Sequence, residues 1–149
     1  MAHTYASIFF HLIWSTKDRS AMIQPSLRKR LYTYIGGIIK NENCDLLSCG
    51  GTKDHVHLLI QISPRNSISD LTRCIKANSS RFVNQNFPEI KFTWQEGYGA
   101  FSVSVSKLEI VRNYIARQEE HHKKISFLDE VVKLFEKHEI EYDKRYLFK

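Results

Sequence analysis

The sequence has few cysteines, no long apolar run and no segment of low complexity. Its three cysteines, Cys44, Cys49 and Cys74, are odd in number and form no Cys-x-x-Cys pattern. This usage argues against a disulfide framework or a zinc knuckle and is typical of a reducing compartment. No stretch approaches the roughly 18 apolar residues of a membrane span, and no signal peptide is evident. We therefore expect a cytoplasmic protein with no membrane partner.

The size and charge of the chain favour one domain with a polyanionic partner. The 149 residues include 42% hydrophobic residues, enough to form a real core. Lys and Arg number 22 against 16 Asp and Glu, a net charge of +6. Such a balance favours nucleic acid, because each neutralised phosphate releases counterions. We expect one domain over residues 1–149, with residues 125–149 as a C-terminal helical extension.

Hydrophobic periodicity predicts the order strand, helix, strand, strand, helix, strand, helix, followed by one more helix. The expected strands lie at 4–15, 44–49, 54–62, 92–94 and 101–105, and the expected helices at 25–43, 67–86, 106–124 and 127–137. Ser106 and Glu109 match a capping box at the start of the third helix. The first six elements match an α+β, ferredoxin-like (RRM-like) split βαβ fold, an antiparallel sheet with helices on one face. Its other face is then open for a ligand.

A pair of histidines is the most informative feature of the chain. His55 and His57 flank Val56 in an apolar run that is typical of a strand. Residues two apart on a strand face the same side, about 6–7 Å from each other. The pair could therefore chelate one metal ion or bind one phosphate, and Gln118 could add an amide oxygen as a third ligand. Two nitrogens and one oxygen suit magnesium, manganese or zinc, and the residues alone do not choose.

Tyr114 lies four residues before Gln118, so both share one face of the expected third helix. A core tyrosine with a hydrogen-bonded hydroxyl is the simpler interpretation. Beside a metal site, however, a phenol could attack a phosphate. His11 is expected to be a hydrogen-bonded core residue, and Asp54 either orients a histidine or ends the turn. His121 and His122 are typical of a solvated helix end, with a phosphate or metal contact as the alternatives.

Several side chains could contact nucleic acid, although each has a simple structural interpretation as solvated surface or core packing. They are the cations Lys17, Arg19, Arg73, Lys76 and Arg81 and the aromatic residues Trp94 and Tyr98.

Five motifs occur together in one order along the chain. They are His-Leu-Ile-Trp at 11–14, Asp-His-Val-His-Leu-Leu at 54–59, Ser-Ser-Arg at 79–81, Trp-Gln-Glu-Gly-Tyr at 94–98 and Tyr-Ile-x-x-Gln at 114–118. With them the chain resembles the IS200/IS605-type single-tyrosine (Y1) transposases of the HUH nuclease superfamily. The resemblance implies that His55, His57 and Gln118 bind Mg²⁺ or Mn²⁺. It also implies that Tyr114 attacks a DNA phosphate, leaving a 5′-phosphotyrosine and a free 3′-hydroxyl.

The resemblance further implies a homodimer that acts on single-stranded DNA with hairpin ends, and it leaves open whether Tyr114 serves its own subunit or its neighbour. We therefore expect a metal-dependent DNA transposase, an endonuclease and strand transferase that cleaves and rejoins single strands. The alternatives are a non-catalytic or domesticated ferredoxin-like nucleic-acid-binding protein and a small hydrolase that uses water as the nucleophile.

Overall fold

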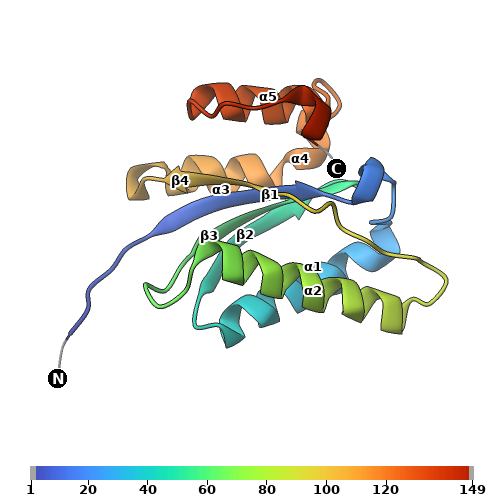
Figure 1. Cartoon of the computed structure of the whole chain (residues 1–149), viewed down its shortest axis with the longest axis horizontal. Coiled ribbons are helices and arrows are strands. Elements are labelled where there is room, and N and C mark those ends of the chain that lie inside the picture. The colour runs from blue at the N-terminus through green and yellow to red at the C-terminus, as the bar shows by residue number, and fades with distance from the viewer. Residues whose placement is uncertain (1–2, 148–149) are drawn as a thin grey trace.

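A four-stranded antiparallel sheet forms the centre of the molecule, which we describe from a computed structural model over residues 3–147 (Figure 1). The strands follow the order β2-β3-β1-β4 across the sheet. Their bounds are β1 (Phe9–Ser15), β2 (Asp45–Gly51), β3 (His55–Gln61) and β4 (Gly99–Val103). Every pairing is antiparallel. The mixed helix-and-sheet fold expected from the sequence is thereby confirmed.

Alternation along β3 gives the sheet two different faces. Val56, Leu58 and Ile60 are fully buried in the main hydrophobic cluster. Side chains on a strand alternate between faces, so His55 and His57 point to the opposite side. The same period on β1 sends Phe10, Leu12 and Trp14 into the main core and leaves His11 on the histidine side.

Two helices cover the first face of the sheet, α1 (Pro25–Asn41) and α2 (Ile68–Asn86), as Figure 1 shows. Pro25 opens α1 at a position where its missing N–H is not needed. Ser67 caps α2 by accepting a hydrogen bond from the N–H of Asp70. The fully buried side chains of Leu27, Leu31 and Ile35 form the stripe of α1 that meets the core.

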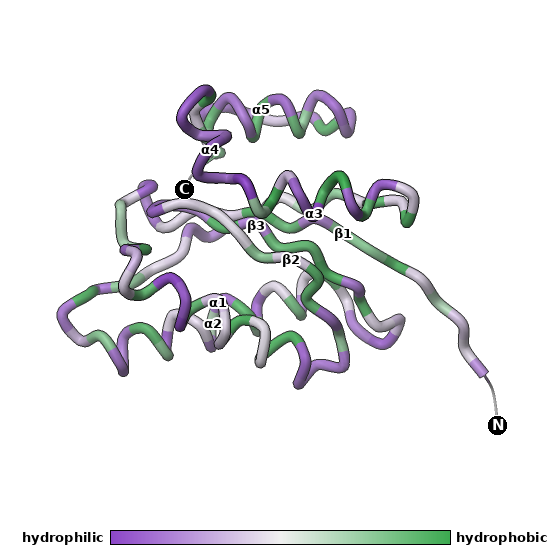
Figure 2. Tube along the Cα trace, turned by 180° about the vertical axis from the view of Figure 1, so that it is seen from behind, coloured by the Kyte–Doolittle hydropathy of each residue, from purple (hydrophilic) through white to green (hydrophobic). Residues whose placement is uncertain are grey.

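The second face of the sheet is covered as well, and the expectation of an open face is wrong. Three helices lie there, α3 (Leu108–Ala116), α4 (Gln118–His121) and α5 (Phe127–Lys137) (Figure 1). α3 packs on β2 and β3. In Figure 2 the apolar positions of α5 lie toward the sheet, where Phe127 and Val131 form a second cluster with Ile13 and Phe101.

The expected helix over 106–124 is interrupted, and its start also differs. The 3-10 turn η2 (Val105–Lys107) precedes α3. Ser104, not Ser106, accepts the capping hydrogen bond, so the predicted capping box does not form. Arg117, with φ −106° and ψ 25°, separates α3 from α4. The chain therefore turns between Tyr114 and Gln118, which nevertheless remain close.

The other elements differ from expectation mainly at their ends. Residues 4–8 are not part of β1, and β2 continues through Gly50 and Gly51, beyond the expected strand end at 49. Trp94 forms only an isolated bridge with Thr16. Two short 3-10 turns complete the description, η1 (Lys17–Arg19) and η3 (Lys144–Tyr146). Within residues 3–147, no helix has both the length and the apolar character that a membrane crossing requires.

Candidate active site

The two histidines of β3 lie side by side on the face covered by α3, α4 and α5. His55 and His57 are both 0% exposed, and their ring centroids are 5.2 Å apart. The alternation of the strand thus brings the two imidazoles together, as the sequence predicts.

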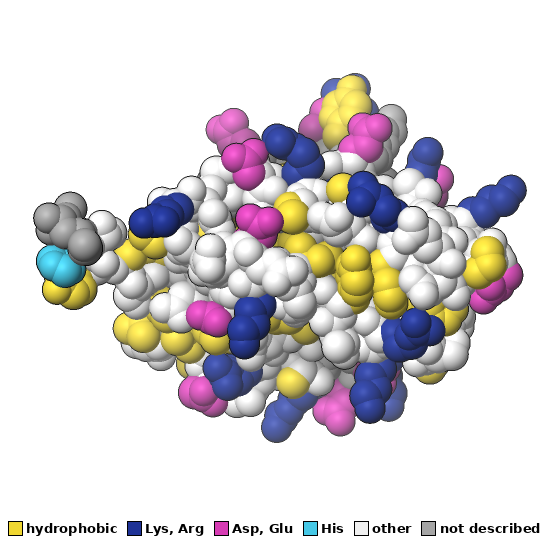
Figure 3. Space-filling model, turned by 90° about the horizontal axis from the view of Figure 1, so that it is seen from below, with side chains coloured by type: hydrophobic (Ala, Val, Ile, Leu, Met, Phe, Trp, Pro, Cys, Tyr) yellow, Lys and Arg dark blue, Asp and Glu magenta, His cyan; other side chains and the backbone are white. Residues whose placement is uncertain are grey.

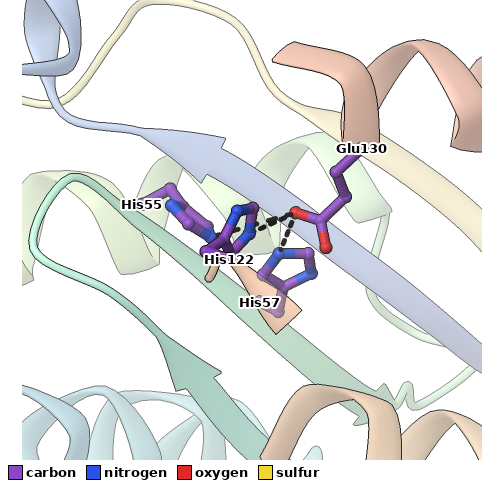
Figure 4. Close-up of side chains that lie close together, drawn as sticks. All are labelled: His55, His57, His122 and Glu130. Atoms are coloured by element: carbon purple, nitrogen blue, oxygen red, sulfur yellow. Dashed lines mark hydrogen bonds and ion pairs between the residues drawn. The ribbon is translucent and has the colours of Figure 1, made fainter. Parts of the chain in front are cut away.

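Two further residues from the C-terminal part of the chain join the pair. Figure 4 shows the imidazoles of His55, His57 and His122 around the carboxylate of Glu130. Glu130 Oε1 lies 3.0 Å from His57 Nε2, 3.1 Å from His122 Nε2 and 3.9 Å from His55 Nε2. One ligand atom from each of these four residues lies within 4.8 Å of every other. We call these four residues the His3-Glu cluster.

Gln118 borders the same cluster. Its side chain is 1% exposed. Gln118 Oε1 lies 3.0 Å from His55 Nε2 and 2.9 Å from His122 Nε2, and Gln118 Nε2 donates to Glu130 Oε2 at 3.0 Å. The amide oxygen therefore faces the Nε2 atoms of His55 and His122.

Tyr114 places its hydroxyl at the edge of this cluster. The half-buried phenol donates a hydrogen bond to Glu130 Oε2, and its oxygen is 3.4 Å from His121 Nε2. The rings of Tyr114 and His57 are 5.9 Å apart. A candidate nucleophile and a candidate metal centre thus occupy one site within one chain.

Neighbouring groups orient the two histidines of β3. His55 Nδ1 is 2.8 Å from Asp54 Oδ1 and 3.1 Å from Thr52 Oγ1. His57 Nδ1 shares a hydrogen bond of 2.8 Å with Nε2 of the buried His11. Both Nδ1 atoms are thereby engaged, which directs both Nε2 atoms toward the centre of the cluster. The interpretation of His11 as a hydrogen-bonded core residue and of Asp54 as an orienting group is confirmed.

Burial and mutual contacts set the charges of the site. Burial lowers the pKa of His57 to about 4, although Glu130 acts in the opposite direction. Burial alone would raise the pKa of Glu130, but hydrogen bonds from His122 and His57 outweigh it and hold that pKa well below its usual range. Burial and the adjacent Glu130 raise the pKa of Tyr114. At neutral pH the site therefore holds an ionised carboxylate beside a neutral phenol.

The donor set fits a divalent cation. Imidazole nitrogens, a carboxylate and an amide oxygen are all common metal ligands, and the site offers them in one buried cluster. A buried ionised carboxylate also calls for positive charge nearby.

Sequence reasoning did not identify Glu130 and took the segment of His122 for a solvated helix end. That interpretation of the segment is wrong, because His122 is partly buried and faces the cluster. Glu130 has a recognisable signal. It lies on the apolar stripe of α5 between Phe127 and Val131, where a charged residue is rarely buried without a partner.

Trp94 and Lys76, two of the predicted DNA contacts, make hydrogen bonds within the protein. Trp94 is 6% exposed and its indole N–H donates to Ser79 Oγ at 2.9 Å. The ammonium of Lys76 donates to the carbonyls of Gln95 and Gly97 at 2.7 Å and 2.6 Å. Burial lowers the pKa of Lys76 to about 8. In this conformation both residues hold the segment before β4 against α2.

The other predicted contacts are more exposed and lie in different places. Lys17 and Arg19 are exposed on η1, and Arg19 lines a surface pocket that also includes His55 and His122. Tyr98 is 40% exposed. Arg73 and Arg81 are exposed on α2, on the opposite side of the sheet from the cluster. Figure 3 looks onto that side and shows basic side chains mixed with acidic ones.

A cavity of about 470 Å³ opens beside the hydroxyl of Tyr114, between β4, α3 and α5. Its lining includes His11, Tyr114, His121 and Glu130, together with three exposed lysines, Lys107, Lys133 and Lys137. A second hollow beside Tyr114 is lined by Arg117, Lys123 and Lys124 among others. Basic side chains therefore flank the candidate nucleophile on two sides.

Comparison with known proteins places this chain in a family. A family model described as "Transposase IS200 like" matches residues 4–118. The transposase for insertion sequence element IS200 from Salmonella typhimurium is 26% identical over 129 residues, which cover 83% of this chain and 84% of the relative. The ISDra2 transposase TnpA from Deinococcus radiodurans is 25% identical over 115 residues, covering 73% and 82%.

Solved structures share the fold. A transposase crystal structure from Deinococcus radiodurans R1 aligns with a TM-score of 0.65 at 25% identity, covering 79% of this chain and 96% of that one. A REP-associated tyrosine transposase bound to a REP hairpin aligns with a TM-score of 0.63 at 12% identity, covering 84% and 74%. Because the family model spans well over half of the chain, the protein belongs to the family of IS200-like transposases.

Proposed function

We propose that this transposase cleaves and rejoins single-stranded DNA through a covalent 5′-phosphotyrosine at Tyr114, with a divalent metal ion bound beside it. One observation carries the proposal: the Tyr114 hydroxyl lies at the edge of the His3-Glu cluster, which includes His55 and His57 and which Gln118 borders. A nucleophile and the groups that would hold the metal meet there with basic side chains around them.

His55, His57 and Gln118 are the residues that would hold the ion, and Mg²⁺ or Mn²⁺ is the proposed cofactor. When bound, such an ion polarises phosphoryl oxygens and offsets charge that develops in phosphoryl transfer. The chain itself positions the donors. Asp54 and His11 fix the two imidazoles, and α3 and α4 carry Tyr114 and Gln118 to them.

The proposed phosphoryl transfer needs no external energy source. Tyr114 Oη forms a bond to phosphorus as the bond between phosphorus and the 3′ oxygen of the DNA breaks. The departing 3′ oxygen takes up the proton that the phenol releases and becomes a 3′-hydroxyl. Because the phosphotyrosine ester retains the energy of the broken bond, a 3′-hydroxyl can later attack it and restore a DNA strand.

The substrate follows from the charge around the site. Lysines line the cavity beside Tyr114, and cationic side chains position a phosphate backbone. A structural neighbour is bound to a REP hairpin, which supports hairpin-ended single strands as the ligand. We keep Lys17, Arg19, Arg73, Lys76, Arg81, Trp94 and Tyr98 as proposed contacts. A homodimer and a single domain over 1–149 also belong to the proposal and rest on family resemblance.

The test is a strand-cleavage assay on labelled single strands from the DNA that flanks the gene, with Mg²⁺, Mn²⁺ or EDTA. We expect metal-dependent cleavage and a covalent adduct with the parent protein and neither with Tyr114→Phe, which should still bind DNA. Tyr34→Phe, on α1, is the matched control and should remain active. Cleavage that survives in Tyr114→Phe would indicate a hydrolase, and hairpin binding without cleavage by the parent would indicate a binding protein.

A further inference from the structure

We propose that Glu130 and His122 are themselves metal ligands, so that the centre is completed by the segment that follows the tyrosine helix. The inference deepens the proposed function and rests on its metal site. Both residues lie beyond residue 118, where the match to the family model ends. This chain would thus hold the ion with the His3-Glu cluster together with Gln118.

The geometry of the carboxylate carries the inference. Glu130 Oε1 faces the Nε2 atoms of His57 and His122 at 3.0 Å and 3.1 Å, and the four candidate ligand atoms lie within 4.8 Å of one another. A cation placed among atoms so spaced needs only small side-chain shifts to reach bonding distances of about 2.0–2.3 Å.

The surroundings of Glu130 also call for a cation. The residue is 2% exposed. Among residues 3–147, its hydrogen bonds and ion pairs involve His55, His57, His121, His122, Tyr114 and Gln118, none of which carries a permanent charge. A buried carboxylate without a positive partner is costly. A bound divalent ion would compensate it, and protonation of His122 is the competing explanation.

Both residues are held in a conformation suited to ligation. His122 Nδ1 donates to the carbonyl of Ile125 at 2.9 Å, which leaves the lone pair of Nε2 directed to the centre. Ser126 caps α5 through the N–H of Asp129. Phe127 stacks on His55 with ring centroids 4.0 Å apart. These contacts fix the start of α5, and with it Glu130, against the histidines.

A consequence is a preference among metals. Mg²⁺ favours oxygen ligands and retains several waters, whereas imidazole suits first-row transition ions. A centre with three imidazoles should therefore prefer Mn²⁺ to Mg²⁺. It should also couple the docking of α5 to metal binding, because the ion would join β3, α4 and α5.

The experiment measures Mn²⁺ binding to the full chain without DNA, by calorimetry and by the loss of the free Mn²⁺ signal in electron paramagnetic resonance. We expect Glu130→Gln and His122→Gln to bind Mn²⁺ about 10- to 100-fold more weakly than the parent. Asp129→Asn is the matched control, because that exposed carboxylate is adjacent to Glu130 on α5, and it should bind like the parent. His122→Gln should also reduce the preference for Mn²⁺ over Mg²⁺.

Several results would overturn the inference. They are a Glu130→Gln affinity within about twofold of the parent, tighter binding by that variant, or no Mn²⁺ binding by the parent. If circular dichroism in EDTA shows that Glu130→Gln does not fold, the Mn²⁺ affinity of His122→Gln alone tests the inference. The experiments distinguish a failure of the proposed function from a failure of this inference. A parent that binds Mn²⁺ through Glu130 but forms no DNA adduct contradicts the proposed function alone, and an active parent with unchanged variant affinities contradicts only this inference.

Discussion

The hydroxyl of Tyr114 donates a hydrogen bond to Oε2 of Glu130, while Oε1 of that carboxylate faces His57 Nε2 at 3.0 Å. One carboxylate thus contacts both the candidate nucleophile and a candidate metal ligand. Because Tyr114 is on α3 and Glu130 on α5, the geometry of the site depends on how both helices pack over the sheet.

The packing of α3 can be tested at Gly50 on β2. A Cβ at this position would lie 2.1 Å from the carbonyl oxygen of Ile115, so α3 contacts the strand backbone directly. We expect Gly50→Ala to displace α3 and Tyr114, destabilise the fold by roughly 1–3 kcal/mol and reduce DNA cleavage strongly. Denaturation and cleavage assays measure both effects.

The matched control for that substitution is Gly37→Ala in α1, where an added Cβ has nothing within 4 Å. It should leave cleavage unchanged and stabilise the protein by up to about 1 kcal/mol, since alanine is the better helix former. A Gly50→Ala protein as stable and active as the parent would contradict the described contact.

The orienting role of Asp54 predicts an effect on metal binding. Its carboxylate is 2.8 Å from His55 Nδ1 and makes the imidazole a better donor. Asp54→Asn should therefore weaken Mn²⁺ binding by about 10-fold or more, measured by calorimetry. Asp45→Asn, an exposed change on β2, should have no effect. Equal affinities for the two variants would argue against this role.

Acid should destabilise the metal-free protein before carboxylates titrate. Burial lowers the pKa of His57 from 6.5 to about 4, so between these values the unfolded chain binds more protons than the folded one. The contribution of His57 is complete above pH 6.5 and is lost as pH falls to 4, by at most about 3 kcal/mol. Urea denaturation in EDTA from pH 7.5 to 4.5 measures the slope.

The comparison for that slope is His57→Gln, which removes the titrating group. Its stability should depend less on pH over the same window. Because His122 has a raised pKa and acts in the opposite direction, the comparison with this variant isolates His57. Equal pH dependence of the unfolding free energy in the parent and in His57→Gln would contradict the burial of His57 in its neutral form.

The lysines around the cavity should bind the DNA backbone. We expect the double variant Lys133→Gln, Lys137→Gln to bind single-stranded DNA more weakly than the parent. The slope of log binding constant against log salt concentration should fall in magnitude by up to about one for each lost phosphate contact. Fluorescence anisotropy at several salt concentrations measures both quantities. Arg73→Gln with Arg81→Gln tests the alternative contact surface on α2, and a larger effect there would place the DNA on the opposite side of the sheet.

The alternating pattern of β3 explains why the sequence predicted the histidine face. Val56, Leu58 and Ile60 are apolar and pack into the main core. Because side chains alternate along a strand, His55 and His57 then point to the opposite face of the sheet. Tyr114 and Gln118 also reach one site, as predicted, although the continuous helix assumed in that prediction breaks at Arg117 between them. These patterns depend on local geometry, which short stretches of sequence specify well.

The features that sequence reasoning missed depend on contacts between distant segments. The break at Arg117 carries no proline or glycine signal, and it redirects His122 toward the histidines. The place of Glu130 on the apolar stripe of α5 indicates that it is buried, but no local pattern reveals that α5 folds over the second face of the sheet and brings it to the histidines. The expected open face failed for the same reason, since the residues that cover it lie at the C-terminal end of the chain.

The most direct test of the central claim is to locate the DNA on the protein. The parent would react with a labelled single strand and Mn²⁺, and after nuclease digestion the adduct would be mapped by mass spectrometry. The account predicts a nucleotide linked through a 5′-phosphate to Tyr114, within the tryptic peptide Asn113–Arg117. Cleaved DNA with no covalent adduct, or an adduct on another residue, would contradict it.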